Sequence, residues 1–436
     1  MGPAPRAIVP WRERLGGLPA SGRDNAPVPL TRRQIYRRRR IAVFGTLFAV
    51  LGGIAYLPLT LLAPVGETDA VVAAPQIATP AVAETSLPGY GASAISAIGH
   101  EGVLAQAGTT EALPMASITK VVTALVVLDA HPLTPGDAGP AITMTSADVE
   151  YYRDYLARNG SVKPVRAGQV FTERELLEIM LIPSANNYAK SLAVWAYGSL
   201  EGYLAAARAW LDAHGLTGVT VVDTSGLDAR SAASASDLLV LGELALADPV
   251  LAEIVAMPTV SVHDVGALEN TNKLLGVNGV DGIKTGTLDG ANLLFSAAIT
   301  VGAREIELVG VVLDGPDHAT INAAIRSMIE QVQAGFREVP LVAAGDALAR
   351  YETPWGDTAD AVAASDASLV VWGDTPITAR VTAHDIRLAD AGAEVGEVVF
   401  TAGTDTARVP LVLARDVDDP GPWWRLGHPE IIFGMG

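Results

Sequence analysis

The chain has 436 residues, 50% of them hydrophobic and 18% charged, which is more than one domain usually holds, so we expect two or three domains with ample apolar sequence for a core. It contains no cysteine, which excludes disulfide scaffolds, cysteine-ligated metal centres and thiol nucleophiles. The net charge is −18, and since residues 1–40 carry +8, the remaining residues carry −26. A region this acidic is repelled by the phosphate backbones of nucleic acids, so nucleic-acid binding is not expected.

A basic arm and an apolar run open the chain. Residues 1–40 hold ten arginines, four of them consecutive at 37–40, and residues 41–65 follow without a charged side chain. As a helix this run would be roughly 37 Å long, enough to cross a hydrocarbon core of about 30 Å. We expect Pro58 to mark the outer end of this transmembrane helix. Because arginine-rich flanks stay in the cytoplasm, the sequence predicts a single-pass protein of the cell membrane with a cytoplasmic N-terminus and an extracellular body.

Two other interpretations of the apolar run remain open. A cleavable signal peptide has a shorter apolar core, about 7–15 residues, and a small-residue cleavage site. The segment Val72-Ala73-Ala74 could be such a site, but it lies well past the apolar run, so we favour an uncleaved anchor. A buried core helix is the weaker alternative, because four arginines flank the run and it shows no amphipathic pattern. Residues 66–85, rich in Ala, Pro, Val and Thr, are expected to form a semi-extended linker.

The first candidate catalytic motif is Ser117-Ile118-Thr119-Lys120, ahead of an apolar helical stretch at 121–128. On a helix, Ser117 and Lys120 are three residues apart and therefore share one face. A Ser near a helix N-terminus has free backbone N–H groups for an oxyanion, and a partly desolvated Lys beside another cation can act as a general base. A pattern this short arises by chance about once in a chain of this size. Of the five lysines, however, only Lys120 has Ser three residues before it.

Two further motifs follow in order. Ser184 and Asn186 come after a predicted helix at 176–181; they could form an ordinary turn, or supply a hydroxyl that relays protons and an amide that binds a substrate. Lys284-Thr285-Gly286 precedes two predicted neighbouring strands, at 293–299 and 306–313. At a strand edge, the ammonium and the hydroxyl suit a carboxylate, and we expect the glycine to let a substrate lie against the strand.

These three motifs, in this order, resemble those of penicillin-binding proteins and serine β-lactamases. Residues 87–333 are most similar to the low-molecular-weight D-alanyl-D-alanine carboxypeptidases. The resemblance implies a β-lactamase/transpeptidase-like α/β (α+β) catalytic domain with a five-stranded antiparallel sheet flanked by helices, and no metal or organic cofactor. The segments that carry it are Ala116-Ser117-Ile118-Thr119-Lys120, Leu181-Ile182-Pro183-Ser184-Ala185-Asn186-Asn187, Asp223-Thr224-Ser225-Gly226-Leu227 and Asn270-Thr271-Asn272-Lys273-Leu274-Leu275.

The resemblance also implies a reaction. Ser117 would be the acylated nucleophile, Lys120 its proton acceptor and Ser184 a proton relay to the leaving group. The enzyme would remove the terminal D-Ala from peptidoglycan stem peptides through an ester on Ser117, and β-lactams would acylate the same serine. No Glu-x-x-Leu-Asn segment is present, which disfavours a class A β-lactamase.

Substrate binding is implied for four more residues. Asn186 would bind the peptide backbone and Lys284 with Thr285 its terminal carboxylate, while Thr287 would add its backbone N–H to that of Ser117 in an oxyanion hole. Relatives often carry an aromatic residue or His where Thr287 stands. This departure leaves the rate and the peptide preference open. A D,D-endopeptidase, a β-lactamase-like hydrolase and an inactive wall-binding scaffold therefore remain alternatives.

Beyond residue 336 the pattern changes to short alternating strands, and it predicts a small all-β domain similar to the second domain of these carboxypeptidases. The predicted strands lie at 369–372, 377–381, 398–400 and 409–413. The predicted organisation is a basic cytoplasmic arm at 1–40, a transmembrane helix at 41–65, a linker at 66–85, a serine D,D-peptidase domain at 86–335 and a β-rich domain at 336–436.

Overall fold

The computed structural model describes residues 31–78 and 81–435, which divide into two compact units. One unit comprises the chain up to Gly66 together with the chain from Asp419 onwards, and the other is Glu67–Asp418. Most of the predicted basic arm, residues 1–30, lies outside the described residues.

The first unit is built on α1 (Arg32–Leu62), the one helix in the described part of the chain that is long and apolar enough to cross a membrane. Thr31 caps its N-terminus through its side chain. The helix continues through Pro58 to Leu62, so the prediction that Pro58 marks its outer end is wrong. A proline this close to a helix end removes one backbone hydrogen bond and leaves the rest of the ladder in place.

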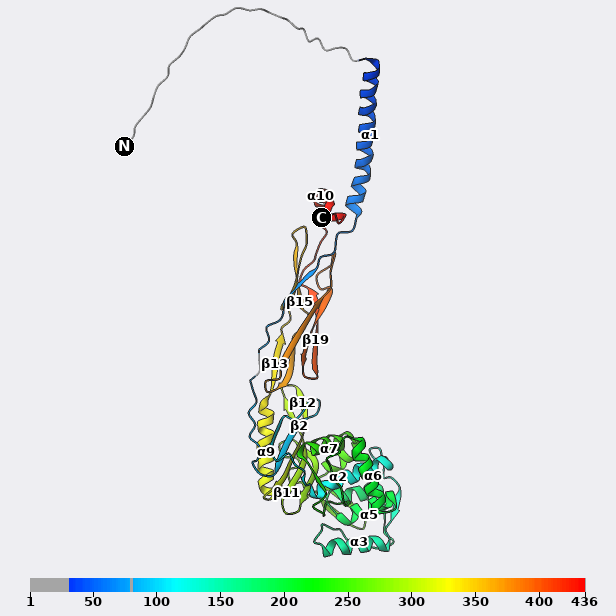
Figure 1. Ribbon diagram of the computed structural model, residues 1–436, viewed down its shortest axis with the longest axis vertical. Helices are drawn as coiled ribbons and strands as arrows, with labels where there is room; N and C mark the ends of the chain where they lie inside the picture. The colour runs from blue at the N-terminus through cyan, green and yellow to red at the C-terminus, as the bar shows by residue number, and fades with distance from the viewer. Residues whose placement is uncertain (1–30, 79–80, 436) are drawn as a thin grey trace, which may run out of the picture. The chain divides into compact units, whose positions relative to one another are not determined.

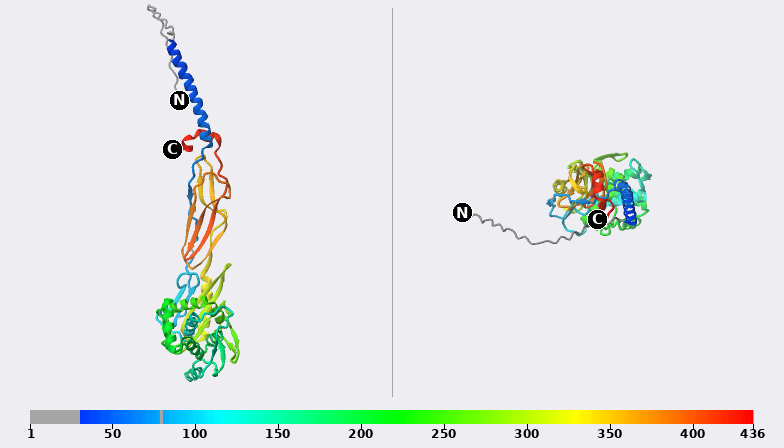
Figure 2. Two further views of the ribbon diagram at one scale, coloured as in Figure 1. Left: turned by 90° about the vertical axis from the view of Figure 1, so that its right-hand side faces the viewer. Right: turned by 90° about the horizontal axis from the view of Figure 1, so that it is seen from above.

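The last residues of the chain belong to this first unit. They form α10 (Gly421–Gly427) and α11 (Pro429–Ile432) instead of continuing the predicted β-rich domain to residue 436. Figures 1 and 2 show α10 beside the C-terminal end of α1, and the two helices are in contact.

The second unit contains a five-stranded antiparallel sheet in the order β10-β11-β12-β2-β3, which confirms the predicted sheet. The two predicted strands at 293–299 and 306–313 lie within β11 and β12 and pair with each other. The first strand of the domain, β2, pairs with β12, so segments more than 200 residues apart form its centre. The strands are β2 (Ala92–Ala97), β3 (Ala105–Gly108), β10 (Val280–Thr287), β11 (Ala291–Val301) and β12 (Arg304–Gly315).

Both faces of this sheet are buried, which is why its strands are almost continuously apolar in sequence. Alternate residues of β11 enter different layers: Leu293 packs in the cluster formed with α9 (His318–Gly335), and Leu294 packs in the cluster formed with α2 (Thr119–Ala130) and α7 (Ala235–Ala247). Figure 1 shows α9 along one face of the sheet and the other helices on the opposite side.

The predicted helices at 121–128 and 176–181 lie within α2 and α4. A Thr172–Glu175 capping box begins α4, in which each residue's side chain satisfies a backbone N–H of the other. The other helices of this layer are η1 (Ala116–Ile118), α3 (Ser146–Ala157), α4 (Glu173–Leu181), α5 (Asn186–Tyr197), α6 (Leu200–Ala213) and α8 (Pro249–Ala256). Three small hairpins accompany them: β4 (Leu113–Pro114) with β7 (Ala232–Ala233), β5 (Ala141–Thr143) with β6 (Val170–Thr172), and β8 (Thr259–Val262) with β9 (Gly266–Glu269).

The β-rich region holds a six-stranded sheet in the order β1-β14-β15-β19-β18-β17 and a separate β13–β16 pair. The four predicted strands lie within β16 to β19, whereas β13, β14 and β15 were not predicted. The strands are β13 (Phe336–Val342), β14 (Ala347–Glu352), β15 (Thr358–Ala363), β16 (Ala367–Trp372), β17 (Ile377–Ala383), β18 (Glu394–Ala402) and β19 (Asp405–Leu413).

Part of the predicted linker is not a linker. Within residues 66–85, the strand β1 (Ala70–Val72) pairs antiparallel with β14, with Val71 opposite Arg350. The edge of β14 otherwise leaves backbone N–H and C=O groups unpaired, and an Ala-Val-Val segment is suited to pairing with them. The prediction of a semi-extended tether is therefore wrong for these residues.

Candidate active site

Ser117 and Lys120 meet at the start of α2. Ser117 lies on η1, a single 3₁₀ turn that runs directly into α2, and Lys120 lies in the first turn of α2. Lys120 Nζ is 2.8 Å from Ser117 Oγ and 3.4 Å from Ser184 Oγ, so one nitrogen bridges two hydroxyls. Lys120 is fully buried, whereas Ser117 is partly exposed. The two residues predicted to share a helical face are thus in hydrogen-bond contact.

Ser184 and Asn186 stand at the turn between α4 and α5. Ser184 adopts a left-handed backbone conformation, φ 64°, and its hydroxyl faces Lys120. Asn186 is the first residue of α5, and its backbone N–H donates to Ser161 O at 2.7 Å. Its Oδ1 is buried without a hydrogen-bond partner among the described residues, although the residue lines the cleft described below. A buried acceptor without a partner is costly, so this oxygen is well placed for an N–H supplied by a bound peptide.

Lys284 and Thr285 form the opposite wall, on β10. Lys284 is 1% exposed, and its Nζ lies 3.2 Å from Thr285 O and 3.5 Å from the hydroxyls of Thr285 and Thr271. The two threonine hydroxyls are 2.6 Å apart. The ammonium therefore stands behind a pair of hydroxyls, an arrangement that suits a carboxylate.

Gly286 lets β10 approach the turn that carries Ser117. A Cβ at Gly286 would lie 2.9 Å from Met115 O and 3.0 Å from Ala116 Cβ. A side chain here would push β10 away from η1 and widen the distance between the two walls. From the sequence we expect this glycine to let a substrate lie against the strand, and the structure adds a second role, the close packing of strand against turn.

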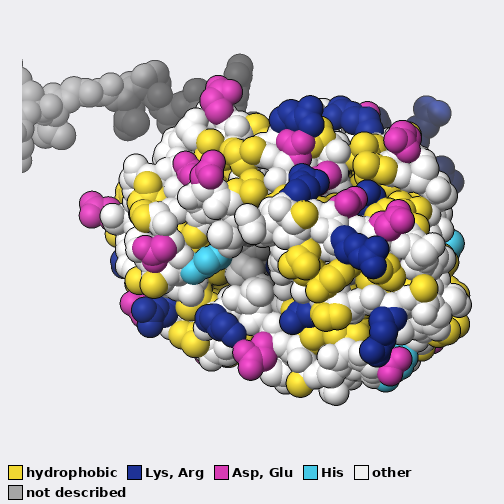
Figure 3. Space-filling view, turned by 90° about the horizontal axis from the view of Figure 1, so that it is seen from below, with side chains coloured by type: hydrophobic (Ala, Val, Ile, Leu, Met, Phe, Trp, Pro, Cys, Tyr) yellow, Lys and Arg dark blue, Asp and Glu magenta, His cyan; other side chains and the backbone are white. Residues whose placement is uncertain are grey.

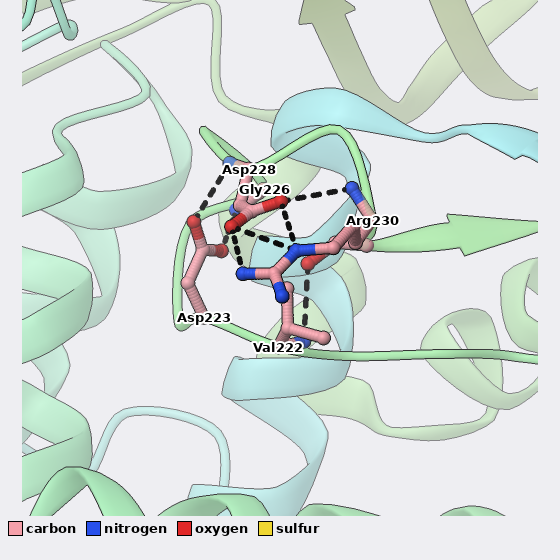
Figure 4. A network of polar contacts seen from close by, with 6 residues as sticks. Val222, Asp223, Gly226, Asp228 and Arg230 are labelled. Atoms are coloured by element: carbon pink, nitrogen blue, oxygen red, sulfur yellow. Dashed lines mark hydrogen bonds and ion pairs between the residues drawn. The ribbon is translucent and has the colours of Figure 1, made fainter.

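The loop at 222–231 forms a third wall (Figure 4). The Asp223 carboxylate accepts the backbone N–H groups of Ser225 at 3.0 Å, Asp228 at 2.9 Å and Gly226. This folds the loop tightly, and Ser225 O accepts a hydrogen bond from Lys120 Nζ at 3.2 Å. By folding this loop, Asp223 positions Ser225 O as the third oxygen around Lys120 Nζ, after the hydroxyls of Ser117 and Ser184.

All three walls open into one cleft of about 1180 Å³. Figure 3 shows a hollow on one face of the molecule with Lys, Arg and His side chains near its rim. Five of the seven predicted site residues line this cleft: Ser117, Ser184, Asn186, Thr285 and Thr287. The other two, Lys120 and Lys284, are buried behind its wall and do not line it.

Burial sets the charge of the two lysines. Desolvation lowers the pKa of Lys120 well below its usual value, the neighbouring Lys284 lowers it further, and Asp223 opposes both effects. Desolvation also lowers the pKa of Lys284 to about 7. A neutral Lys120 amine can accept the proton of Ser117, and a carboxylate bound beside Lys284 would favour the charged form of that lysine.

Two cleft residues that contact the predicted site residues, His318 and Thr271, were not themselves predicted. His318 begins α9, and its Nε2 lies 2.7 Å from Thr287 Oγ1. Burial, and after it Lys284, lowers the pKa of His318, while Asp317 raises it; the net effect favours the neutral ring. No local signal marks His318, since only the fold joins it to β10. Thr271 lies in one of the segments that carry the family resemblance, which could have drawn attention to it.

The family model described as D-alanyl-D-alanine carboxypeptidase matches residues 94–317, just over half of the chain. The chain belongs to this family. The predictions of family, fold and enzyme class, a hydrolase of the serine carboxypeptidase type, are confirmed. The match covers η1, α4, α5 and β10, so all three motifs lie within the part shared with the D-alanyl-D-alanine carboxypeptidases.

Individual members of the family show how far the likeness extends. The D-alanyl-D-alanine carboxypeptidase DacB2 of Mycobacterium tuberculosis is 31% identical over 223 residues, which are 49% of this chain and 72% of that protein. The carboxypeptidase DacC of Escherichia coli is 29% identical, over 48% of this chain and 53% of its own length. A D-alanyl-D-alanine endopeptidase of Pseudomonas aeruginosa is 29% identical, over 37% of this chain and 51% of its own length.

Solved structures with the same fold extend over more of the chain. The peptidoglycan synthesis regulatory factor PBP3 of Streptococcus pneumoniae superposes with a TM-score of 0.55 at 22% identity, covering 75% of this chain and 98% of its own. Penicillin-binding protein 5 of Haemophilus influenzae gives 0.53 at 20% identity, covering 80% and 100%. At these identities the likeness establishes the fold of the D-alanyl-D-alanine carboxypeptidase and nothing finer.

Proposed function

We propose that this protein removes the terminal D-alanine from peptidoglycan stem peptides through an acyl-enzyme on Ser117. One observation carries the proposal: Lys120 Nζ, buried and with a lowered pKa, lies within hydrogen-bond distance of both Ser117 Oγ and Ser184 Oγ. A neutral amine between two hydroxyls can take a proton from one and pass a proton through the other. Ser117 is then the nucleophile, since its Oγ is 2.8 Å from Lys120 Nζ, against 3.4 Å for Ser184 Oγ.

The chemistry balances with protein groups and water alone. Lys120 Nζ takes the Ser117 proton as Oγ forms a bond to the carbonyl carbon of the penultimate D-Ala. The backbone N–H groups of Ser117 and Thr287 stabilise the oxyanion. The C–N bond then breaks, and the proton returns through Ser184 to the amine of the departing D-alanine. Water, activated by the same lysine, hydrolyses the ester and regenerates Ser117.

The residues of the opposite wall support a preference for a free C-terminus. Lys284 and Thr285 would bind the terminal carboxylate, and Asn186 would accept an N–H from the peptide backbone. The carboxylate needs charge on Lys284, whereas the nucleophile needs a neutral Lys120. The neighbouring Lys284 lowers the proton affinity of Lys120, so the two lysines divide these two roles by position.

The decisive experiment combines turnover with covalent labelling. The purified protein should release D-alanine from a pentapeptide ending in D-Ala–D-Ala and should bind fluorescent penicillin. Ser117→Ala should lose both, whereas Ser368→Ala, a hydroxyl that does not line the cleft, should retain both. The intact mass after incubation with a β-lactam gives the same answer directly. Labelling that survives Ser117→Ala would refute the assignment of the nucleophile.

An endopeptidase activity is the second candidate, because one relative carries the name D-alanyl-D-alanine endopeptidase. Both reactions use the same acyl-enzyme and differ in the amine that leaves. Incubation with cross-linked muropeptides and with monomeric pentapeptide separates them, since only an endopeptidase converts the dimers to monomers. A protein that forms no acyl-enzyme with any β-lactam would instead be a wall-binding scaffold.

We further propose that α1 anchors the enzyme in the cell membrane, with the arginine-rich arm in the cytoplasm and the catalytic domain outside. The support is the length of α1, its exposed apolar side chains and the charge on its N-terminal side. The intact mass of the protein extracted from membranes distinguishes an uncleaved anchor from a cleaved signal peptide. Protease added to intact cells should digest the body and spare the arm.

A further inference from the structure

The cleft has a further edge that the proposed reaction does not use. It is the segment 158–163, which follows α3 and which we call the rim loop. Apart from Val162, every residue of the rim loop lines the cleft: Arg158, Asn159, Gly160, Ser161 and Lys163. A peptide held at Ser117 therefore shares its cleft with the rim loop.

The rim loop is fixed to the turn that carries Asn186. The backbone N–H of Asn186 donates to Ser161 O at 2.7 Å. The Asn187 side chain accepts the N–H of Lys163 at 3.1 Å and donates to its carbonyl at 3.0 Å. A Cβ at Gly160 would lie 2.8 Å from Asn186 Nδ2, so the rim loop also packs closely against that amide. The backbone of Lys163 is thus held in place beside Asn186, as a residue that selects substrates requires.

Lys163 differs from the other cations of the cleft in having no partner. The Lys and Arg residues that line the cleft are Arg158, Lys163 and Lys273. Lys273 Nζ lies 3.5 Å from a carboxylate oxygen of Glu269, and the Arg158 guanidinium lies 5.7 Å from the centre of the Tyr155 ring. No ion pair or hydrogen bond joins Lys163 Nζ to any residue of 31–78 or 81–435. Because Lys163 is half-buried, its charge is best stabilised by an anion from outside the chain.

The rim loop is cationic in a chain that is otherwise acidic. Residues 155–172 include three cations, at 158, 163 and 166, and no Asp or Glu, whereas the whole chain carries −18. Two acids also line the cleft, but Glu269 pairs with Lys273, and Asp289 lies in the turn between β10 and β11. The charge around the rim loop therefore favours an anionic group.

We propose that Lys163 selects substrates by binding a carboxylate on the side chain of the residue that precedes D-Ala–D-Ala. The inference rests on the proposed function, in which Ser117 attacks the penultimate D-Ala and Asn186 binds the peptide backbone. Both D-Ala residues carry only methyl groups, so the residue before them is the first that can present a charge beside Asn186. The lysine ammonium on its flexible stem can pair with such a carboxylate, whereas a carboxamide offers it no charge.

The test uses two pentapeptides that differ in one group. The residue before D-Ala–D-Ala carries a free side-chain carboxylate in one peptide and the corresponding carboxamide in the other. We expect kcat/KM for D-alanine release to be about fivefold higher for the carboxylate peptide. The difference should lie in KM, because this contact is the same in the ground state and the transition state. Lys163→Met should abolish the preference, and Lys163→Arg, which keeps the charge, should retain it.

Arg166→Met is the matched control. Arg166 is exposed and does not line the cleft, so its loss changes the net charge equally and should leave the preference intact. Acylation by benzylpenicillin, whose side chain is uncharged, measures whether the catalytic groups are undisturbed. Its rate in Lys163→Met should stay within about twofold of the rate in the unchanged protein.

Several results would overturn the inference. A preference that is absent from the unchanged protein, or that survives in Lys163→Met, rules out Lys163 as the selecting residue. A preference lost equally in Arg166→Met would indicate a diffuse field instead of a contact. Equal losses with both peptides and with benzylpenicillin in Lys163→Met would show that Lys163 only supports the Asn186 turn. Failure of the proposed function looks different: neither peptide releases D-alanine and Ser117 is not labelled, and the inference falls with it.

Discussion

The peptidase domain and the β-rich region bury very different side chains. Around the cleft, the buried groups include two lysines, several hydroxyls and asparagine amides, and the backbone at Ser184 is left-handed. In the described β-rich residues from 336 to 418, Thr353 is the only polar residue among the buried ones, and ion pairs such as Arg350–Asp360 lie on the surface. The β-rich region is thus built for stability, whereas the cleft retains arrangements that oppose stability because they perform chemistry.

The largest expected effect is on Lys120. Lys120→Met should lower the second-order rate of acylation by penicillin about 10³-fold, since it removes the proton acceptor. The free energy of unfolding should change by less than about 2 kcal/mol, because the lost hydrogen bonds are offset by no longer burying a polar amine. Stopped-flow acylation and urea unfolding measure the two quantities.

Lys190→Met is the matched control, since Lys190 lies on α5 over the Tyr151 ring and does not line the cleft. It should leave the acylation rate within about twofold, because a cation–π contact at the surface stabilises by about 1 kcal/mol at most. Equal rates for Lys120→Met and the unchanged protein would show that another group is the base.

The next effect separates packing from function. Gly286→Ala and Gly396→Ala each place a methyl group against neighbouring backbone, at Met115 O in the first case and at Thr382 O in the second. Both should lower the free energy of unfolding by about 1–3 kcal/mol. Only Gly286→Ala should slow acylation, by about tenfold or more, because only there does the displaced strand form a wall of the cleft.

Gly89→Ala, at a position where a Cβ meets nothing within 4 Å, controls for the substitution itself. Comparable acylation by the Gly286 and Gly396 variants would contradict the role given to the β10–η1 contact.

The free energy of unfolding should depend on pH through the buried lysine Lys284. Burial lowers the pKa of Lys284 to about 7, so between pH 7 and its unfolded pKa, near 10.4, the unfolded chain binds more protons than the folded one. Stability therefore rises with pH across that window, by up to about 1.4 kcal/mol per pH unit for each such lysine. Lys284→Met should make this slope shallower, as measured by urea unfolding from pH 7 to 10.

Two glutamates, the buried Glu173 and the half-buried Glu307, should change the free energy of unfolding in a different, more acidic pH range. Burial raises the pKa of Glu173 and of Glu307 to about 7, so each favours folding less as pH rises from about 4.5 to 7. For Lys284, a free energy of unfolding that rises between pH 7 and 10 as steeply in Lys284→Met as in the unchanged protein would contradict the prediction. It would show that this lysine is charged in the folded protein over that range. For catalysis, kcat/KM for the pentapeptide should fall above pH 7 as Lys284 loses its proton.

A smaller effect is expected at His318. His318→Ala removes the hydrogen bond to Thr287 Oγ1 and should reduce the acylation rate about fivefold, in line with roughly 1 kcal/mol for one such bond. The equivalent substitution of His384, in the β-rich region, should have no effect on acylation. A His318 variant with the full rate would show that Thr287 needs no support from α9.

The smallest effect belongs to the β-rich region. Asp360→Asn breaks the surface pair with Arg350, whose side chain is 64% exposed, and should change the free energy of unfolding by less than about 1 kcal/mol. The acylation rate should stay the same. A loss of several kcal/mol would mean that this region also depends on charged groups.

The accuracy of the sequence-based predictions differs along the chain for physical reasons. The strands β11 and β12 were found because each is a long apolar run, and α2 because its apolar residues are continuous. The strands β1, β14 and β15 were missed because short segments with several alanines carry little hydrophobic signal and form only when a partner strand offers its backbone. The end of α1 was misplaced because a proline in the last turns of a helix leaves the rest of its hydrogen-bond ladder in place, so the helix continues past Pro58.

The sequence by itself determined the family, the long apolar helix and the motif residues that meet at the cleft, because residue chemistry and motif order are local properties. Tertiary structure alone decided that Lys120 and Lys284 are both buried, which sets their charge, and that His318 on α9 contacts Thr287 on β10. It also decided that Arg425 donates a hydrogen bond to the carbonyl of Ala63 at the end of α1, more than 360 residues away in the sequence. Burial and long-range contacts depend on how the chain folds back on itself, and no spacing along the sequence encodes them.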